Sequence, residues 1–287
     1  MSSKARCDSH VHIIGSLERY PQLPTRTYLA GLAPLEDLRS LAGRRGISRF
    51  VIVQPSFYGT DNALILESLD LLGEQGRGVV VIDPAAVSAE MLADYTASGV
   101  CGVRVNLYSM LGSQERRLDR AFATLLDTAR GMDWHIEVIA PIAALVQHSD
   151  TLLRSHVPVV IDHYGVYGQA LPGSGEGRRL LELLRYPHIW MKLSAPYRVS
   201  TNPMETHPNQ AWLAAILAVA ADRCVWGSDW PHTPPHEAQK GSEVPGRYRP
   251  LSYERLVDDF WTALPSSELA ERIMSDNPAR LYGFSGR

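Results

Sequence analysis

The 287-residue sequence lacks any apolar run that approaches the roughly 20 residues of a membrane-spanning helix. It has only three cysteines, far apart and without a Cys-x-x-Cys pair, so neither a disulfide framework nor a zinc knuckle is expected. Its first residues contain no apolar signal segment, and we therefore expect a cytoplasmic protein.

The sequence also has no large excess of positive or negative residues. The chain has 28 Lys and Arg against 31 Asp and Glu, which gives a formal net charge of −3. This balance gives no reason to expect a nucleic-acid or membrane partner. The sequence is 45% hydrophobic and 21% charged, which is ordinary for a globular protein. Its length suggests about two domains, although barrels of alternating strands and helices often run to ~250 residues as one domain.

Short β-branched runs alternate with helical patterns along the whole chain. The predicted strands cover residues 7–13, 49–56, 78–83, 102–107, 135–140, 158–163, 189–194 and 224–229. The predicted helices cover residues 35–45, 63–75, 86–98, 117–130, 143–155, 178–186, 209–221, 253–264 and 267–281. This alternation indicates parallel strands, and their number predicts an α/β protein with a single-domain (β/α)8 TIM barrel over residues 1–287. An open doubly wound sheet is the alternative.

The first predicted strand carries two histidines within strict alternation. Asp8, His10 and His12 are expected on one face of this strand, because side chains alternate between the two faces. The other face is expected to carry Cys7, Ser9, Val11 and Ile13. Two imidazoles on one face can converge on one metal ion or one carbonyl oxygen.

Further polar residues stand at the ends of the predicted strands, where a barrel places its active site. His163 could join His10 and His12 around a carbonyl oxygen. Asp229, at the end of the last strand, could take a proton from water and return it to the leaving oxygen. These residue types suit the hydrolysis of an ester or a lactone.

Two arginines at the same edge favour an anionic substrate. Arg104 and Arg198 could each bind a carboxylate through paired hydrogen bonds. We expect additional substrate contacts from Ser56, Thr60, Asn106 and Tyr197. The histidines of the later loops are expected to lie on the surface, namely His207, His232 and His236.

Several motifs resemble the amidohydrolase superfamily. These are Asp-x-His-x-His at residues 8–12, Ile-Asp-His at 161–163 and Trp-Gly-Ser-Asp-Trp-Pro-His at 226–232. The segments Gly-Thr-Asp-Asn at 59–62 and Ser-Ala-Pro-Tyr-Arg at 194–198 are similar to its lactonase branch. The resemblance covers essentially the whole chain. It implies a TIM-barrel hydrolase that opens a lactone, with Asp229 as the general base.

The resemblance also narrows the substrate. It implies a small carboxylate-bearing lactone, like 2-pyrone-4,6-dicarboxylate or a sugar-acid lactone. The dicarboxylate lactonase pattern has a further arginine shortly after Val-Arg-x-Asn, where this chain has Tyr-Ser-Met at residues 108–110. Arg116 and Arg117 follow somewhat later and are candidates to replace it.

The metal requirement of the site stays open at this point. Many superfamily members bind zinc through the His-x-His pair, a fifth-strand histidine and the eighth-strand aspartate. Here the fourth strand offers Arg104, which repels a cation, and the fifth offers Glu137, so a binuclear set is incomplete. We expect metal-independent catalysis and no cofactor. The alternative is a single divalent metal such as zinc on His10, His12, Asp229 and Glu137.

Three other functions remain open. They are a zinc-dependent decarboxylase, a lactone isomerase on the same barrel, and a barrel that binds an anionic metabolite without turnover. The expected partner is a small anionic lactone, and the sequence leaves open whether the protein forms a homo-oligomer.

Overall fold

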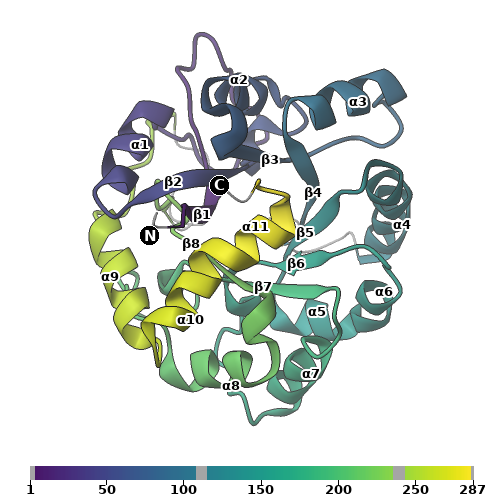
Figure 1. The fold of residues 1–287 in the computed structure, drawn as a ribbon. Coiled ribbons are helices and arrows are strands. Elements are labelled where there is room, and N and C mark those ends of the chain that lie inside the picture. The colour runs from purple at the N-terminus through teal and green to yellow at the C-terminus, as the bar shows by residue number, and fades with distance from the viewer. Residues whose placement is uncertain (1–3, 108–114, 235–242, 286–287) are drawn as a thin grey trace.

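A computed structural model describes residues 4–107, 115–234 and 243–285. Within it, eight parallel strands form one sheet in the order in which they occur along the chain (Figure 1). They are β1 (Arg6–Val11), β2 (Ile47–Val53), β3 (Gly76–Val80), β4 (Val100–Asn106), β5 (His135–Ile139), β6 (Val159–Ile161), β7 (Ile189–Ser194) and β8 (Cys224–Gly227). The sequential, all-parallel order confirms the predicted (β/α)8 architecture.

The first and last strands close the barrel just beyond the end of β8. Asp229 N donates to His10 O at 2.9 Å, and His12 N donates to Trp230 O at 2.8 Å. Gly227 allows this approach, because a Cβ at that position would lie 2.9 Å from the backbone nitrogen of His10. Closure therefore brings the two histidine positions of β1 beside Asp229.

The helices form a ring around the strands, as Figure 1 shows. They are α1 (Leu35–Gly43), α2 (Ala63–Leu72), α3 (Ala89–Ala97), α4 (Glu115–Met132), α5 (Ile142–Gln147), α6 (Ser149–Leu153), α7 (Gly175–Leu183), α8 (Gln210–Ala220), α9 (Tyr253–Ala263), α10 (Ser267–Glu271) and α11 (Asn277–Tyr282). Side-chain caps fix several helix starts; Ser88 accepts from Met91 N, and Ser252 accepts from Arg255 N. None of the described helices is long and apolar enough to cross a membrane.

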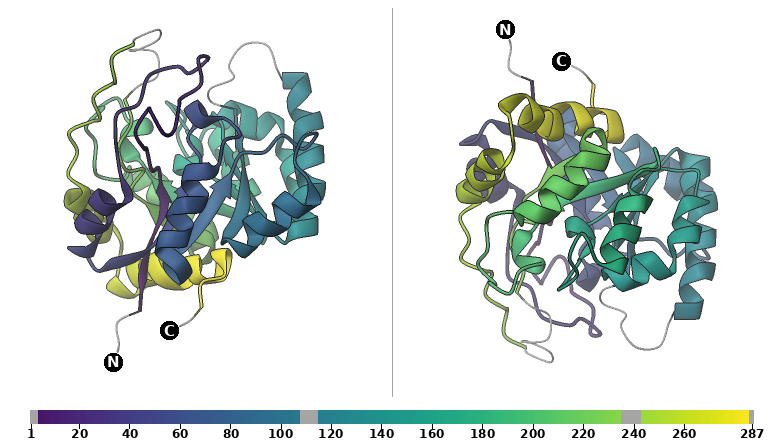
Figure 2. Two further views of the ribbon diagram at one scale, coloured as in Figure 1. Left: turned by 90° about the horizontal axis from the view of Figure 1, so that it is seen from above. Right: turned by 90° about the horizontal axis from the view of Figure 1, so that it is seen from below.

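The last helices cover the end of the barrel at which the strands begin. In Figure 1, α10 and α11 cross that opening, and Figure 2 shows both chain termini at this end. Buried side chains form an interior apolar cluster there, made of Cys7, Val51, Val53, Val79, Val160, Trp190, Val225, Tyr282 and Phe284. The active site is therefore left to the opposite end, where the strands finish.

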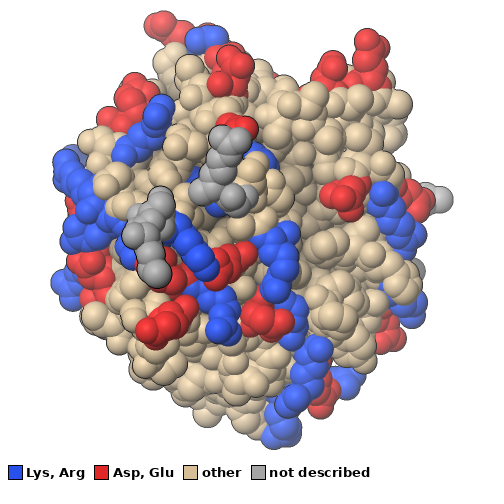
Figure 3. Space-filling view, in the orientation of Figure 1, with Lys and Arg blue, Asp and Glu red and all other residues tan. Residues whose placement is uncertain are grey.

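The outer surface at the covered end carries charges of both signs. Figure 3 shows Lys and Arg interspersed with Asp and Glu on this face. Lys4 Nζ pairs with Asp276 at 2.6 Å, and both side chains are exposed. Exposed pairs of this kind contribute little to stability, typically about 0–1 kcal/mol, so the apolar interior dominates the fold.

The strict alternation expected along β1 is wrong for two of its residues. Cys7 packs in the interior apolar cluster, whereas Asp8 accepts a hydrogen bond at 2.9 Å from the hydroxyl of Tyr253 in α9. The pairing of β1 with β2 shifts register between Asp8 and Val11, which breaks the period of two. Asp8 Oδ1 also accepts from Ser228 N at 2.9 Å, so this carboxylate ties β1 to β8 and α9.

Candidate active site

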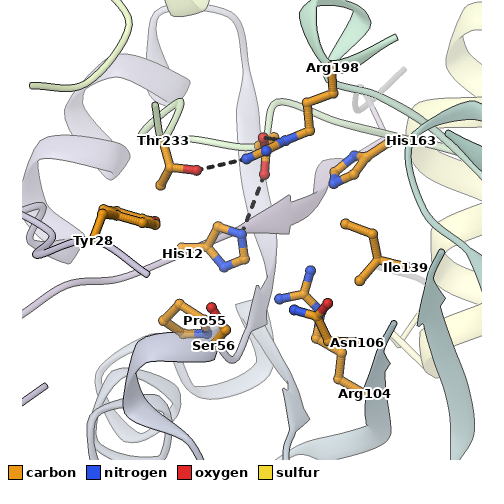
Figure 4. Close-up of a pocket in the computed structure, with 11 residues that line it drawn as sticks. His12, Tyr28, Pro55, Ser56, Arg104, Asn106, Ile139, His163, Arg198 and Thr233 are labelled. Carbon is orange, nitrogen blue, oxygen red and sulfur yellow. Dashed lines mark hydrogen bonds and ion pairs between the residues drawn. The ribbon is translucent and has the colours of Figure 1, made fainter. Parts of the chain in front are cut away.

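A cavity of about 400 Å³, counted with its open mouth, lies at the end of the barrel where the strands finish (Figure 4). Its walls come from the segments that follow β1, β2, β6, β7 and β8 and from the ends of β4 and β5. The lining residues are His12, Tyr28, Pro55, Ser56, Arg104, Asn106, Ile139, His163, Arg198, Asp229 and Thr233.

Asp229 is buried in the turn after β8, with a backbone φ of 60°. Its Oδ2 atom accepts two hydrogen bonds of 2.6 Å, from the hydroxyl of Tyr197 and from Nε of Arg198. Its Oδ1 atom has no hydrogen-bond partner among the described residues, and lies 3.4 Å from His12 Nε2 and 3.6 Å from His10 Nε2. One carboxylate oxygen is thus held in place, and the other faces the imidazoles.

The surroundings of Asp229 favour its ionised form. Burial by itself raises the pKa of this carboxyl, but the guanidinium of Arg198 and the nearby imidazoles more than offset it. The pKa therefore lies well below its usual range. Arg198 is the largest single contribution that lowers this pKa, and its guanidinium stays charged at all relevant pH values. Asp229 is a carboxylate at neutral pH and can accept a proton.

His163 and His12 line the cavity from neighbouring walls, as Figure 4 shows. His163 Nδ1 lies 2.8 Å from the hydroxyl of Ser194, and burial lowers the pKa of His163 to about 4. His12 Nδ1 lies 2.7 Å from the carbonyl oxygen of Val53. A carbonyl oxygen only accepts, so Nδ1 of His12 carries a proton and Nε2 turns toward Asp229.

His10 lies beneath the cavity rather than in its wall. Its ring is 5.0 Å from that of His12 and 4.8 Å from that of His163, measured between centroids. Burial lowers the pKa of His10 well below its usual value, and the nearby Lys192 charge acts in the same direction. The structure therefore brings the three predicted imidazoles together around Asp229.

Below the imidazoles lies a group of buried charges. Glu137 and Lys192 form an ion pair, Lys192 Nζ is 3.6 Å from Asp162 Oδ1, and Arg104 Nη2 is 3.5 Å from Asp162 Oδ2. With Arg198 and Asp229 this makes a charged cluster of six side chains, namely Arg104, Glu137, Asp162, Lys192, Arg198 and Asp229. Its three cations match its three anions while His10 and His163 are neutral.

The predicted carboxylate-binding arginines both reach the cavity. Arg104 Nη1 donates to the carbonyl oxygen of Gln54 at 2.8 Å, while its buried Nε has no partner within the described part of the chain. Arg198 bonds Asp229 through Nε and the hydroxyl of Thr233 through Nη2 at 2.7 Å. Arg198 therefore orients the predicted base as well as facing the cavity.

The other predicted substrate contacts divide into two groups. Ser56 and Asn106 line the cavity. Thr60 is exposed and does not line it, and its carbonyl oxygen accepts from the side chain of Asn62. Tyr197 is buried behind Asp229 and is also not a lining residue. Its position supports the base instead of contacting a ligand.

The predicted metal set is rearranged in the structure. His10, His12 and Asp229 offer one ligand atom each within 4.8 Å of one another, and so do His10, Asp162 and His163. Glu137 belongs to neither group, and its carboxylate is paired with Lys192. The predicted role of Glu137 as a metal ligand therefore has no support from its contacts.

Several site residues were not anticipated from the sequence. Tyr28 and Thr233 belong to irregular segments without a periodic pattern, and Ile139 is apolar, so a search for polar strand ends passes over it. His232, expected on the surface, is 3% exposed; its ring packs against Tyr197, and its carbonyl oxygen accepts from Arg249 N. His236 and the side chains of Arg116 and Arg117 lie outside the described residues.

The sequence profile of the Amidohydrolase family matches residues 7–284. This chain belongs to the Amidohydrolase family. The amidohydrolase is 30% identical to the 4-sulfomuconolactone hydrolase of Hydrogenophaga intermedia over 279 residues, which cover 96% of this chain and 88% of that protein. It is 27% identical to the D-galactarolactone isomerase of Agrobacterium fabrum over 289 residues, which cover 97% of this chain and 91% of that protein.

A solved structure shares the fold of this amidohydrolase over almost its full length. It is the crystal structure of a probable 2-pyrone-4,6-dicarboxylic acid hydrolase from Acinetobacter baumannii with citric acid bound. The TM-score is 0.81 at 25% sequence identity, and the match covers 97% of this chain and 99% of that chain. The family and the resemblance to lactone-acting members agree with the sequence motifs.

Proposed function

We propose that the protein hydrolyses a small lactone that carries a carboxylate, with Asp229 as the general base. The observation that carries this proposal is that the two carboxylate oxygens of Asp229 have different surroundings. Asp229 lines the cavity; Tyr197 and Arg198 occupy its Oδ2 atom, while its buried Oδ1 atom lies beside the imidazoles of His10 and His12 without a hydrogen-bond partner in the described residues. A carboxylate held in this way is ready to accept a proton from water.

In the proposed reaction, Asp229 Oδ1 takes a proton from a water molecule as the water oxygen bonds to the lactone carbonyl carbon. His12 and His163 line the cavity where the lactone carbonyl would bind, and an N–H donor there would stabilise the oxygen as it gains charge, while His10 lies behind them. The ring C–O bond then breaks, and the leaving oxygen takes the proton from Asp229. The new carboxylic acid ionises near neutral pH and releases a proton to solution.

The substrate class follows from the charge of the cavity. The guanidiniums of Arg104 and Arg198 both line it, and guanidinium groups bind carboxylates through paired hydrogen bonds. Relatives named as hydrolases of sulfomuconolactone and pyrone dicarboxylic acid, one of them with citric acid bound, support an anionic substrate. Ile139, Pro55 and Tyr28 supply less polar walls for the ring.

A metal ion is not assigned to this proposed reaction. The donors of His10, His12 and Asp229 are close enough for one divalent ion, but the charges around them do not fit it. Arg198 already neutralises the Asp229 carboxylate through Oδ2, and the charged cluster is balanced without a further cation. A divalent ion would add two uncompensated positive charges to a buried site.

The proposal is tested by pH-stat titration of purified protein with a panel of lactones at neutral pH. We expect one proton released per ring opened, with carboxylated lactones turned over at higher kcat/KM than neutral lactones of the same ring. Treatment with a chelator followed by dialysis should leave the rate unchanged. Equal rates on both lactone classes, or loss of the rate after chelation and its return with zinc, would contradict the proposal.

A second candidate is lactone isomerisation, because a relative of similar length is named D-galactarolactone isomerase. Asp229 would then move a proton between substrate hydroxyls while the acyl group migrates, without net consumption of water. The same titration separates the two functions, since an isomerase consumes the lactone without releasing a proton, as followed by NMR of the substrate.

A further inference from the structure

Lys192 is a buried cation directly beneath the predicted catalytic imidazoles. It lies on β7 and is completely buried. Its Nζ atom forms an ion pair with Glu137, lies 3.1 Å from His10 Nδ1 and lies 3.6 Å from Asp162 Oδ1. Two carboxylates therefore lie within ion-pair distance of this ammonium group. The proposed reaction above gives this cation no role.

The contact between Lys192 and His10 restricts the position of the imidazole proton. An ammonium group has three N–H donors and no acceptor. A hydrogen bond of 3.1 Å between Lys192 Nζ and His10 Nδ1 therefore needs a lone pair on Nδ1. A neutral imidazole with a lone pair on Nδ1 carries its proton on Nε2, the atom that faces Asp229.

The neighbouring carboxylates do not compete for this position. Asp162 Oδ1 is 3.3 Å from His10 Nδ1, and Glu137 Oε1 is 3.5 Å from it. Neither oxygen forms a hydrogen bond with correct geometry to any described residue. A proton on Nδ1 would also point at the ammonium of Lys192, which is electrostatically unfavourable.

His10 in β1 and His12 just after it are therefore not equivalent. His12 donates through Nδ1 to the carbonyl of Val53, which leaves a lone pair on Nε2 when the ring is neutral. His10 has the reverse arrangement. A metal ion bound between these residues would need a lone pair on Nε2 of both rings, and His10 offers an N–H there instead.

We infer that Lys192 is a positioning residue that holds His10 in its Nε2–H tautomer, which makes His10 a hydrogen-bond donor in the site and keeps it from serving as a metal ligand. The inference rests on and deepens the proposed function, because a donor at this point faces Asp229 Oδ1, the atom proposed to take the proton from water. It would also account for metal-independent catalysis by a His-x-His pair with a nearby Asp, as the proposed function expects.

The first test is the tautomer of His10 in the unaltered protein. Protein labelled with 15N-histidine is studied by long-range 1H–15N NMR at neutral pH, and the His10 signals are assigned by their loss in a His10→Asn variant. We expect a protonated Nε2 and an unprotonated Nδ1 for His10. A protonated Nδ1 would overturn the inference. This reading needs no substrate, so it is independent of whether the lactonase proposal holds.

The second test removes the ammonium group. In Lys192→Met, His10 Nδ1 loses its donor, so it can carry the ring proton instead and donate a hydrogen bond to Asp162 Oδ1, and the tautomer should reverse. Zinc affinity, measured by equilibrium dialysis with zinc alone, should rise about 10–100-fold, the usual range of effects of residues that contact metal ligands. Lys4→Met, which removes an exposed lysine far from the site, should change neither property.

A double variant keeps the test possible if Lys192→Met alone does not fold. Lys192→Met with Glu137→Gln removes both charges of the ion pair and keeps the charged cluster balanced. Circular dichroism checks that each protein is folded. A folded variant of either kind that keeps the Nε2–H tautomer and the original zinc affinity would overturn the inference. The reversed tautomer together with tighter zinc binding would support it.

Discussion

The inside of this barrel has two contrasting regions. Near the start of the strands, the interior apolar cluster packs valines against Tyr282 and Phe284 and is sealed by α11. Toward the strand ends, the interior is the charged cluster and the three imidazoles. On β7 the change takes two residues, from Trp190 in the apolar cluster to Lys192 in the charged one. One set of strands thus supports both a dry core and a reaction site.

The backbone follows the same division. Most non-glycine residues with positive φ in the described residues lie in the turns after β6, β7 and β8, at His163, Tyr164, Val166, Ala195, Asp229 and His232; the two others, Asp133 and His156, precede β5 and β6. Such conformations cost of order 1–3 kcal/mol each and persist where the surroundings enforce them. The contrast teaches that the covered end mainly provides stability, whereas the open end holds strained and charged groups for chemistry. Substitutions at each end of the barrel test whether the two regions have these separate roles.

The largest effect is expected at the open end, from Asp229→Asn. An amide cannot take a proton from water, so we expect kcat/KM for lactone hydrolysis to fall about 10²–10⁴-fold, the usual contribution of a general base. Proton release in the pH-stat measures the loss. Asp222→Asn, an exposed and distant change of the same type, is the matched control and should keep full activity. Full activity in folded Asp229→Asn would show that another group is the base.

The second prediction concerns pH. In the native protein the acid limb of kcat/KM should lie near pH 4 or below, because the pKa of His163 is about 4 and that of Asp229 is well below its usual value. Burial raises the pKa of Asp229 and the Arg198 charge lowers it, so removing Arg198 should raise this pKa. The base must be deprotonated, so activity is lost as pH falls through this pKa. A raised pKa therefore moves the acid limb to higher pH.

This shift is measured by comparing the pH profiles of Arg198→Met and Arg198→Lys. The lysine variant keeps the positive charge and should keep the limb closer to its original position. If the acid limb lies at the same pH in both variants, the charge of Arg198 does not control the pKa of Asp229. The contribution of Arg198 would then be its hydrogen bond from Nε to Asp229.

A smaller effect, confined to one class of substrate, is expected from Arg104→Gln. The guanidinium lines the cavity, and its buried Nε has no partner in the described part of the structure. A hydrogen bond to a charged group contributes about 1.5–3 kcal/mol, so KM for carboxylated lactones should rise about 10–100-fold. Neutral lactones and the exposed control Arg255→Gln should show little change. An equal rise for neutral lactones would remove Arg104 from carboxylate recognition.

The fold was predictable from the sequence because its signals are local and repeated. Eight β-branched runs, each followed by a helical pattern, specify parallel strands and leave few topologies. The histidines of β1, His163 and Asp229 could be placed for the same reason, because each stands at the end of a strand. The positions of site residues at strand ends could therefore be predicted from the sequence alone.

The remaining site features depend on contacts that no local pattern records. The register shift in β1 turns Asp8 toward Tyr253, 245 residues away, and the role of Tyr197 depends on Asp229. Lys192 reads as an ordinary strand-end lysine until Glu137 and His10 are placed beside it. Tyr28 and Thr233 reach the cavity from irregular segments, where sequence periodicity gives no orientation.

The smallest effect on activity is expected from the covered end, in Val51→Ala. Val51 is completely buried in the interior apolar cluster, and the change removes two methyl groups. The lost burial at about 0.8 kcal/mol per group, together with the cavity left behind, should lower the free energy of unfolding by about 2 kcal/mol. Urea denaturation measures this loss, and kcat/KM below the unfolding transition should stay unchanged. If instead Val51→Ala lowered kcat/KM while the free energy of unfolding stayed constant, the apolar cluster would have to position the charged cluster directly, because both lie on the same strands. The two regions could then no longer be treated as separate.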